Sequence, residues 1–401
     1  MSNKKKLIPA LRFPEFKEDG EWEEKRLGEI CDITNGKANA QDHIENGKYP
    51  LFDRSSVIKA SNEFTFDCES IIIPGEGMAF VPKYYQGKFN LHQRAYALLN
   101  FRTLGFFVYY TMLHKSHLLA QKAVRSTVLS LRLPILLDFD IEIAKSLPEQ
   151  QKIAACLSSL DDLLAAHNEK LELLKGHKKG LMQNLFPQEG ERVPKFRFPE
   201  FENDGEWEEK TLGDLLEQKP EYGINAAAVE FSEELPTYLR ITDISEDGHF
   251  LNKEKVSVAK AVTEKNYLVE GDVVMARTGA SVGKSYKYRK SDGKLVFAGF
   301  LIRIKPTCDL LDSEFLFQFF ATDVYWKWVK YISARSGQPG INGAEYSSMP
   351  IGIPSSINEQ QKIASCLSEV DDLIKAETEK IEALKAHKKG LMQGLFPKME
   401  N

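Results

Sequence analysis

Apolar residues recur at alternating steps of four and three in two long stretches of the chain. In the first stretch this seam consists of Ile153, Leu157, Leu160, Leu164, His167, Leu171, Leu174, Lys178, Leu181 and Leu185. In the second stretch it consists of Ile363, Leu367, Val370, Ile374, Glu377, Ile381, Leu384, Lys388, Leu391 and Leu395. This heptad spacing predicts two long α-helices that bury the seam in a coiled coil. A helix of about 35 residues is roughly 50 Å long, and neither seam can stay exposed, so the simplest arrangement packs one helix on the other.

Polar residues interrupt both seams at matching places. His167 occupies the position of Glu377, and Lys178 occupies the position of Lys388. Polar residues at seam positions can fix the register of a coiled coil or mark its end. They can also contact a partner subunit, and the sequence leaves both interpretations open.

The helical stretches belong to a repeat that organises the whole chain. Residues 13–28 return as 198–213 at an offset of 185, and residues 148–187 return as 358–397 at an offset of 210, with 28 identities in 40 positions. A solenoid would repeat its whole unit at one shorter period. The unequal offsets instead predict a repeated frame whose second copy holds 25 more residues than the first.

The frame holds two segments that do not align by eye, which we call the first insert (29–146) and the second insert (214–356). Short apolar runs that end at glycine loops predict buried strands, and longer runs predict helices, so both inserts are expected to be mixed α/β. The predicted strands are 70–74 and 272–276, and the predicted helical segments are 104–123 and 313–331.

Composition places the chain among ordinary globular proteins. It has 401 residues, of which 42% are hydrophobic and 28% are charged, and no run approaches the ~20 apolar residues of a membrane span. The polar start and the short apolar run that follows it do not suit a signal peptide, so a cytoplasmic protein is expected. The five cysteines form no CxxC pair, which favours reduced thiols over disulfides or a metal site. They are Cys31, Cys68, Cys156, Cys308 and Cys366.

The distribution of charge says more than the net charge of −5. Residues 81–132 carry eight Lys and Arg and no Asp or Glu, and residues 271–305 carry eight against two. Lysine and arginine attract phosphates, and Arg, Gln, Asn and His can read base edges. A solvated basic face would explain either segment alone, but two such segments in a duplicated frame favour a nucleic-acid partner.

Two motifs imitate catalytic sites without meeting their requirements. Residues 278–285 resemble a phosphate loop, but the spacing from the first glycine to Gly283 fails by one and a strand pattern follows. Residues 279–283 match a nucleophile elbow formally, yet the only later histidine is His387, inside a predicted coiled-coil helix. His114 and His117 fit ordinary helix positions, and no dinucleotide or amino-methyltransferase motif is present. We therefore expect no catalytic site and no metal site in this chain.

Several segments resemble the specificity subunits of type I restriction-modification enzymes. Residues 147–153, before a heptad helix that ends at 178–183, look like the central repeat of that family, and residues 359–393 look like its distal repeat. Further segments are similar to motifs common in its target-recognition domains. They are residues 271–284, Arg125 to Val128 and Arg335 to Pro339. The resemblance covers nearly the whole chain, and the order of domain, helix, domain and helix is its most specific part.

The resemblance implies a fold of the α+β class. Two target-recognition domains of mixed α/β structure would be joined by two long antiparallel coiled-coil helices with pseudo-two-fold symmetry. The domain boundaries would be 1–147 for the first target-recognition domain, 148–187 for the central helix, 188–357 for the second target-recognition domain and 358–401 for the distal helix. The packing residues would be Leu157, Leu160, Leu164, Leu171, Leu174, Leu367, Val370, Ile374, Ile381 and Leu384.

The resemblance also implies a function. Each insert would recognise one half of a bipartite, asymmetric target in double-stranded DNA, and the chain would be non-catalytic and bind no cofactor. Two modification subunits would bring S-adenosylmethionine for adenine methylation, and two restriction subunits would act with ATP and magnesium. An alternative of another class is a coiled-coil scaffold whose basic inserts bind RNA or protein.

The candidate DNA-binding residues come from the basic segments and the family-like motifs, with Arg240 in addition. They are Lys83, Lys88, His92, Gln93, Arg94, Arg125, Ser126, Thr127, Arg240, Arg277, Thr278, Gly279, Ser281, Lys284, Lys287, Arg335, Ser336 and Gln338. Among them, Arg277 has the planar fork that reads a guanine edge, whereas Lys284 suits a phosphate contact.

Overall fold

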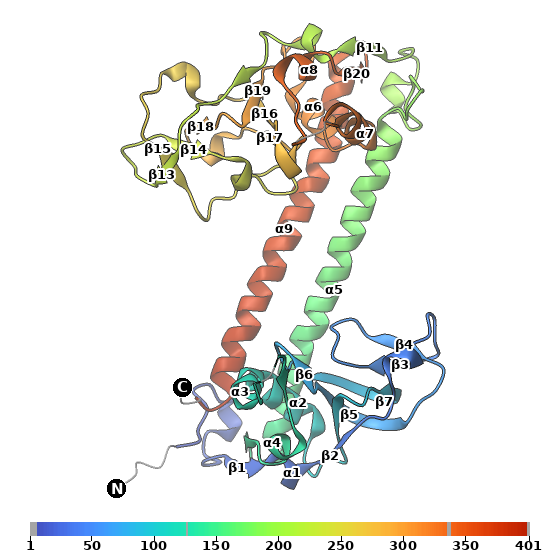
Figure 1. Ribbon diagram of the computed structural model, residues 1–401, viewed down its shortest axis with the longest axis vertical. Coiled ribbons are helices and arrows are strands. Elements are labelled where there is room, and N and C mark those ends of the chain that lie inside the picture. The colour runs from blue at the N-terminus through green and yellow to red at the C-terminus, as the bar shows by residue number, and fades with distance from the viewer. Residues whose placement is uncertain (1–5, 126, 335–337, 399–401) are drawn as a thin grey trace. The chain divides into compact units, whose positions relative to one another are not determined.

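The computed structural model describes residues 6–125, 127–334 and 338–398, and the chain divides into two compact units (Figure 1). Unit 1 takes the chain up to residue 169 and again from residue 379, and unit 2 takes residues 170–378. Each unit therefore contains one insert together with part of each long helix.

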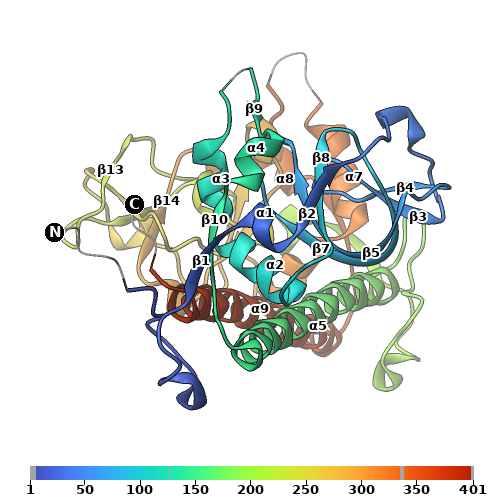
Figure 2. The ribbon, with the colours of Figure 1, turned by 90° about the horizontal axis from the view of Figure 1, so that it is seen from below.

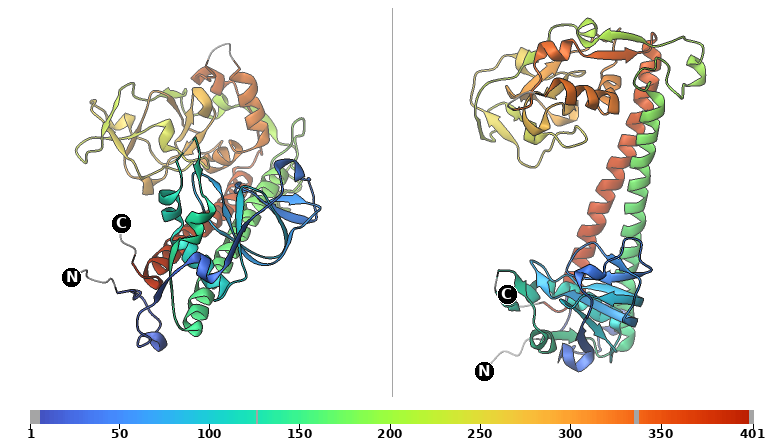
Figure 3. Two further views of the ribbon diagram at one scale, coloured as in Figure 1. Left: turned by 60° about the horizontal axis from the view of Figure 1, so that its bottom comes forward. Right: turned by 45° about the vertical axis from the view of Figure 1, so that its right-hand side comes forward.

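The two predicted long helices are present. Helix α5 spans Leu147–Leu185 and α9 spans Ile357–Leu395. In unit 1 the early α5 residues Ile153 and Leu157 share a core with Leu395 of the last turn of α9. In unit 2 the late residue Leu185 shares a core with Ile363 of early α9. The start of one helix thus packs on the end of the other in both units, so the helices pair antiparallel; Figure 3 shows them side by side.

The seam residues separate from their neighbours by burial, as the heptad pattern predicts. Leu157, Leu367, Val370 and Ile381 are buried, and Leu160, Leu164, Leu171, Leu174, Ile374 and Leu384 are half-buried. Leucines just outside the seam are exposed, namely Leu163, Leu173 and Leu373. In the middle of the seam these side chains are only half-buried, because the facing helix covers them on one side.

In unit 1 the first insert forms a six-stranded sheet with the order β2-β8-β5-β7-β3-β4. Its pairs are antiparallel except β3 with β7. The strands are β2 (Asp32–Asn35), β3 (Tyr49–Phe52), β4 (Lys59–Ser61), β5 (Phe66–Pro74), β7 (Lys83–Leu91) and β8 (Ala95–Leu99). The short strands β6 (Glu76–Gly77) and β9 (Leu129–Ser130) pair separately.

The helices of unit 1 cover this sheet and connect it to the long helices. They are α1 (Leu27–Ile30), α2 (Gly105–His114), α3 (Ser116–Lys122) and α4 (Leu133–Leu137), with 3-10 turns η1 (Pro14–Phe16) and η2 (Ala40–Asp42). Figure 2 shows α2 between the sheet and α5, and the Tyr110 hydroxyl of α2 donates to Asp161 of α5 at 2.7 Å. The predicted helical segment 104–123 is two helices that break at Lys115.

In unit 2 the second insert forms two four-stranded sheets, with the orders β12-β19-β16-β17 and β13-β15-β14-β18. The first comprises β12 (Glu221–Tyr222), β16 (Val273–Ala276), β17 (Ser285–Lys287) and β19 (Leu301–Ile304). The second comprises β13 (Ala228–Glu230), β14 (Thr237–Leu239), β15 (Val256–Val258) and β18 (Leu295–Phe297). The predicted strands 70–74 and 272–276 correspond to the buried part of β5 and to β16.

The helices of unit 2 share a core with the long helices, and the 3-10 turns lie in its connecting segments. The helices are α6 (Ser313–Phe319), α7 (Asp323–Ile332) and α8 (Gly343–Ser347). The 3-10 turns are η3 (Pro199–Phe201), η4 (Leu212–Leu215), η5 (Ile241–Asp243), η6 (Glu264–Asn266), η7 (Gly279–Ser281) and η8 (Lys290–Asp292). The predicted helical segment 313–331 is therefore α6 and α7, and the side chain of Thr322 caps the N-terminus of α7.

A two-stranded base closes each insert. Strand β1 (Glu23–Arg26) pairs antiparallel with β10 (Asp140–Ile143), and β11 (Glu208–Thr211) pairs antiparallel with β20 (Pro350–Ile353). The chain therefore enters and leaves each insert on neighbouring strands. All five cysteines are free thiols, and no helix of the described residues is long and apolar enough to cross a membrane.

Candidate nucleic-acid interface

A buried carboxylate fastens the first repeated block to the start of α5. Glu149 accepts hydrogen bonds from Nε and Nη2 of Arg12 at 2.7 and 2.8 Å and from the indole of Trp22 at 3.3 Å. Glu149 is fully buried. A buried carboxylate is tolerated only when it is paired and its oxygens accept hydrogen bonds, so these residues hold one another in place.

The same constellation recurs in unit 2. Arg197 donates to Glu359 at 2.8 and 2.7 Å, and the indole of Trp207 donates to the same carboxylate at 3.4 Å. The following residue also repeats its role, because the Gln150 side-chain oxygen accepts from the Leu104 N–H before α2 at 3.3 Å and that of Gln360 accepts from the Asp312 N–H before α6 at 2.9 Å. The repeated sequence blocks therefore form the same hydrogen-bonded contact in both units, and this contact fixes each insert to the long helices.

The polar seam positions form a second repeated contact. Lys178 of α5 pairs with Asp371 of α9 at 2.6 Å in unit 2, and Lys388 of α9 pairs with Asp161 of α5 in unit 1. Glu377 is buried and pairs with Lys170 at 2.9 Å. Both lysines bridge the two helices, which supports the interpretation that they fix the register.

In unit 2 the loop after β16 lies against the segment before α8. The Gly279 N–H donates to the Pro339 carbonyl at 3.0 Å, and the Ile341 N–H donates to the Arg277 carbonyl at 2.9 Å. Gly279 has a φ of +77°, and a Cβ there would lie 3.2 Å from the Gln338 amide nitrogen. The fold thus brings Gln338 to Gly279 and the residues after it to Arg277 and Thr278, and Ser281 lies in the same turn as Gly279.

Arg277 is held from one side only. Its guanidinium lies over the ring of Tyr222 at 4.7 Å, and Nη1 approaches the Gly299 carbonyl at 3.5 Å. Its Nε is buried without a hydrogen-bond partner in the described structure. Stacking on an aromatic ring fixes the plane of the guanidinium, so Arg277 is pre-oriented.

Other predicted cations of unit 2 are neutralised by carboxylates of the same unit. The pairs are Lys284–Glu246 at 2.7 Å, Lys287–Glu314 at 2.9 Å and Arg240–Asp243 at 2.7 Å. The side chains of Lys284 and Lys287 are largely covered, whereas Glu246 is fully exposed. A contact of these cations with DNA stays a prediction, and it would require that phosphates compete with the carboxylates.

Unit 1 places an equivalent pair of loops side by side, because β6 pairs with β9 and the Leu131 N–H donates to the Gly75 carbonyl at 2.8 Å. Arg94 pairs with Glu76 at 3.0 Å near these loops. Arg125 and Thr127 are exposed in the loop before β9. The predicted residues Ser126, Arg335 and Ser336 lie outside the described residues.

The other predicted residues of unit 1 lie on the sheet and its turns. Lys83 donates to the Ser55 carbonyl at 2.6 Å, and the Lys88 ammonium lies 4.7 Å from the centre of the Phe64 ring. His92 accepts from the Arg94 N–H at 3.1 Å through Nδ1, and Gln93 donates to Asn39 at 3.0 Å. These residues therefore surround β7 and the turn that follows it.

The basic segments contribute less surface charge than their sequences suggested. Lys115 is buried and pairs with Glu142 at 2.8 Å. Arg303 is buried between Glu221 and Asp272. Both are internal ion pairs, because a buried cation is stable only beside a carboxylate, so neither belongs to a basic face.

Sequence reasoning missed three exposed residues beside these loops. The ring of Tyr222 stacks on the guanidinium of Arg277. Arg54 lies 3.7 Å from Glu76, and Phe300 is exposed next to the loop after β16. Tyr222 and Arg54 are far from their partners in sequence, and Phe300 is apolar. A search for basic clusters could find none of the three.

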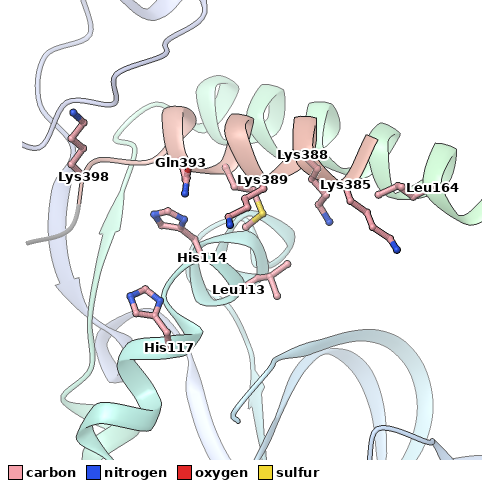
Figure 4. Close-up of a pocket in the computed structure, with 10 residues that line it drawn as sticks. Leu113, His114, His117, Leu164, Lys385, Lys388, Lys389, Gln393 and Lys398 are labelled. Carbon is pink, nitrogen blue, oxygen red and sulfur yellow. The ribbon is translucent and has the colours of Figure 1, made fainter. Parts of the chain in front are cut away.

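A cavity of about 790 Å³ lies in unit 1 between α9 and the α2–α3 corner (Figure 4). Its lining residues are Leu113, His114, His117, Leu164, Lys385, Lys388, Lys389, Met392, Gln393 and Lys398. The His114 ring stacks on Phe396 at 5.2 Å, and burial lowers the pKa of His114. The lysines suit an anionic group. No three His, Cys, Asp or Glu side chains of the described residues could together hold a metal ion.

The family model described as "Type I restriction modification DNA specificity domain" matches the chain twice, at residues 19–175 and 204–386. Each match takes in one insert, its two-stranded base and a large part of the helix that follows.

The chain belongs to this family. Among its relatives are two specificity subunits. It is 24% identical over 365 residues to the type I restriction enzyme EcoDI specificity subunit of Escherichia coli. This alignment covers 86% of this chain and 80% of that protein. It is 23% identical over 417 residues to the type I restriction enzyme MjaVIII specificity subunit of Methanocaldococcus jannaschii. This alignment covers 98% of this chain and 94% of that protein.

Solved structures show the same fold. The S subunit of a type I restriction-modification system from M. genitalium has a TM-score of 0.69 at 15% identity, over 98% of this chain and 100% of that chain. A second chain, from a study of complex assembly and conformational transition of the type I R-M system, has a TM-score of 0.52 at 14% identity, over 98% of this chain and 99% of that chain. The α+β fold implied by the sequence resemblance is thereby confirmed.

Proposed function

We propose that this specificity subunit reads a bipartite, asymmetric target in double-stranded DNA, one half per insert, and directs methylation and restriction by partner subunits. One observation carries the proposal. In each unit a loop at the end of a buried strand is tied to the loop before the next helix, and predicted base-reading side chains gather there. The hydrogen-bonded contacts of Glu149 and Glu359 fix the repeated block before each insert to the long helices.

The role of the chain in the reaction would be recognition and positioning. S-adenosylmethionine, ATP and magnesium would be bound by two modification subunits and two restriction subunits, and this chain would carry out no chemical step. The names of the relatives, which are specificity subunits of type I restriction enzymes, support this division of labour.

Exchange of the first insert tests the proposal. Residues 29–146 would be replaced by the corresponding insert of a related subunit, and methylated adenines would be mapped by long-read sequencing in cells that carry the complete system. We expect one half of the methylated target to change and the other half to remain. A simultaneous change of both halves would contradict a modular target.

Binding experiments separate this function from the scaffold alternative. The complex assembled with its modification subunits should bind duplex DNA with an affinity that falls steeply as salt rises, and it should favour the mapped target. Equal or tighter binding of RNA duplexes or single strands would favour the scaffold interpretation.

A further inference from the structure

One turn has the same backbone framework in both inserts, although the inserts do not align in sequence. In unit 1 this turn is residues 92–95, between β7 and β8. Four backbone hydrogen bonds fix it. They are His92 N–H to Phe52 O (2.8 Å), Gln93 N–H to Ala38 O (2.9 Å), Ala95 N–H to His92 O (2.9 Å) and Gly75 N–H to Arg94 O (2.9 Å).

In unit 2 the turn is residues 298–301, between β18 and β19. The matching bonds are Ala298 N–H to Leu239 O (2.9 Å), Gly299 N–H to Ile224 O (2.8 Å), Leu301 N–H to Ala298 O (2.8 Å) and Arg277 N–H to Phe300 O (3.1 Å). The first residue of each turn also forms a matching parallel bridge, His92 with Ala38 and Ala298 with Ile224. The framework therefore superposes Phe300 on Arg94 and Arg277 on Gly75.

The two turns differ in the chemistry that they offer. Unit 1 presents His92, Gln93 and Arg94, whose side chains donate and accept hydrogen bonds. Unit 2 presents alanine, glycine and Phe300, and the Phe300 side chain is 63% exposed. A single exposed phenylalanine is common by itself, but the carbonyl of this one accepts the backbone N–H of Arg277, the predicted base-reading arginine.

We propose that Phe300 contacts the C5-methyl group of a thymine in the second half of the target and so selects thymine at that position; this inference rests on the proposed function. In the major groove every base pair offers hydrogen-bonding groups, and thymine alone adds a methyl group. A side chain without donors or acceptors can discriminate only through such an apolar contact. The neighbouring Arg277 reads an adjacent base pair by hydrogen bonds.

Removal of the methyl group from the DNA tests the contact directly. Each thymine in the mapped second half of the target is replaced singly by deoxyuridine, and binding is measured by competition with the complex of this chain and its modification subunits. We expect one replacement to weaken binding by about fourfold, which is the loss of affinity expected when one buried group of the size of a methyl is removed. Phe300→Ala should weaken binding to the thymine target and should lose sensitivity to that replacement.

Two further variants control for structure. Phe300→Leu keeps an apolar side chain and should retain part of the sensitivity to the methyl group. Phe231→Ala removes another exposed phenylalanine of unit 2, 41% exposed and remote from the turn in the sheet order, and should bind like the unaltered protein. All variants are compared for assembly of the complex by size-exclusion chromatography.

The results distinguish the two proposals. Equal sensitivity to deoxyuridine in the unaltered and Phe300→Ala complexes, or a second half-target without thymine, would overturn the inference about Phe300. Failure of the unaltered complex to favour its mapped target over other duplexes would instead refute the proposed function.

Discussion

At the scale of single residues, the stacking of Arg277 on Tyr222 determines the effect expected when the Arg277 side chain is removed. The guanidinium is stacked on Tyr222 and therefore loses little side-chain entropy when it binds. Arg277→Ala should cost on the order of 1–3 kcal/mol of binding free energy and relax specificity at one base pair of the second half-target. Titration against cognate and single-mismatch duplexes measures this. Arg192→Ala, an exposed arginine outside both inserts, is the control, and unchanged discrimination by Arg277→Ala would remove the loop from the interface.

Lys284 is predicted to contact phosphate, and its pairing with Glu246 adds a second variant to the test. Lys284→Ala should weaken binding to all sequences about equally and reduce the salt slope by about one. Glu246→Gln removes the competing carboxylate, so it should strengthen binding to all sequences. Both are measured as affinity against salt concentration on cognate and unrelated duplexes. A change in Glu246→Gln that is confined to one sequence would contradict a phosphate role for Lys284.

Sequence reasoning named most residues of the candidate interface in unit 2 but not their arrangement. Arg277 and Gln338 were selected from separate motifs, and a glycine that adopts positive φ lets their loops meet. Tyr222 could not be found, because stacking under an arginine leaves no pattern along the chain. Lys115 and Arg303 were counted as surface cations, because their carboxylate partners are distant in sequence.

At the scale of elements, the pairing of α5 with α9 is the feature open to direct test. Leu164→Glu or Ile374→Glu places a carboxylate in the seam, and burial of a polar group without a partner costs about 1–3 kcal/mol. We expect weaker assembly with the modification subunits and weaker DNA binding. Size-exclusion chromatography and duplex titration report both effects.

Matched controls for these variants lie one helical position away. Leu163→Glu and Leu373→Glu introduce the same charge on the same helices outside the seam, where the side chains are exposed, and they should assemble normally. Normal assembly of all four variants would argue that the helices do not pair through the seam.

The corner between α2 and α3 predicts a pH dependence of stability. Burial lowers the pKa of His114 below its ordinary value, an effect that His117 and Lys115 reinforce and Glu142 opposes. The unfolded chain therefore binds more protons between the folded pKa and about 6.5, so stability is complete above pH 6.5 and falls as the pH drops below it.

Chemical denaturation at pH 7.5 and pH 5.5 checks this expectation. His114→Phe should reduce the loss of stability at the lower pH, because phenylalanine can occupy the apolar contact with Phe396 without taking up a proton. His177→Gln, at an exposed position of α5, should leave the pH dependence unchanged. An unaltered pH dependence in His114→Phe would show that other groups cause it.

At the scale of the whole molecule, the sequence predicted the frame because a repeat is visible without alignment to other proteins. The long helices followed from apolar periodicity, and β5, β16 and one helical segment in each insert followed from apolar runs, but the division of each segment into two helices was not predicted. The likeness between the inserts was invisible, because backbone hydrogen bonds conserve geometry rather than residue type. The 25 additional residues of the second copy accompany a second sheet there, where the first insert has a single six-stranded sheet.

The shared long helices also set the order in which the chain can complete its folding during synthesis. The core of unit 1 includes Leu395 and Phe396, the Trp22 ring packs against Phe396, and the Leu11 N–H bonds the Gly394 carbonyl. Unit 2 consists of residues 170–378. Domains generally fold in the order in which they leave the ribosome, yet here the part that begins first must wait for the last helical turns. When residue 378 has left the ribosome and the last turns of α9 are still inside it, the chain can therefore complete its second unit but not its first.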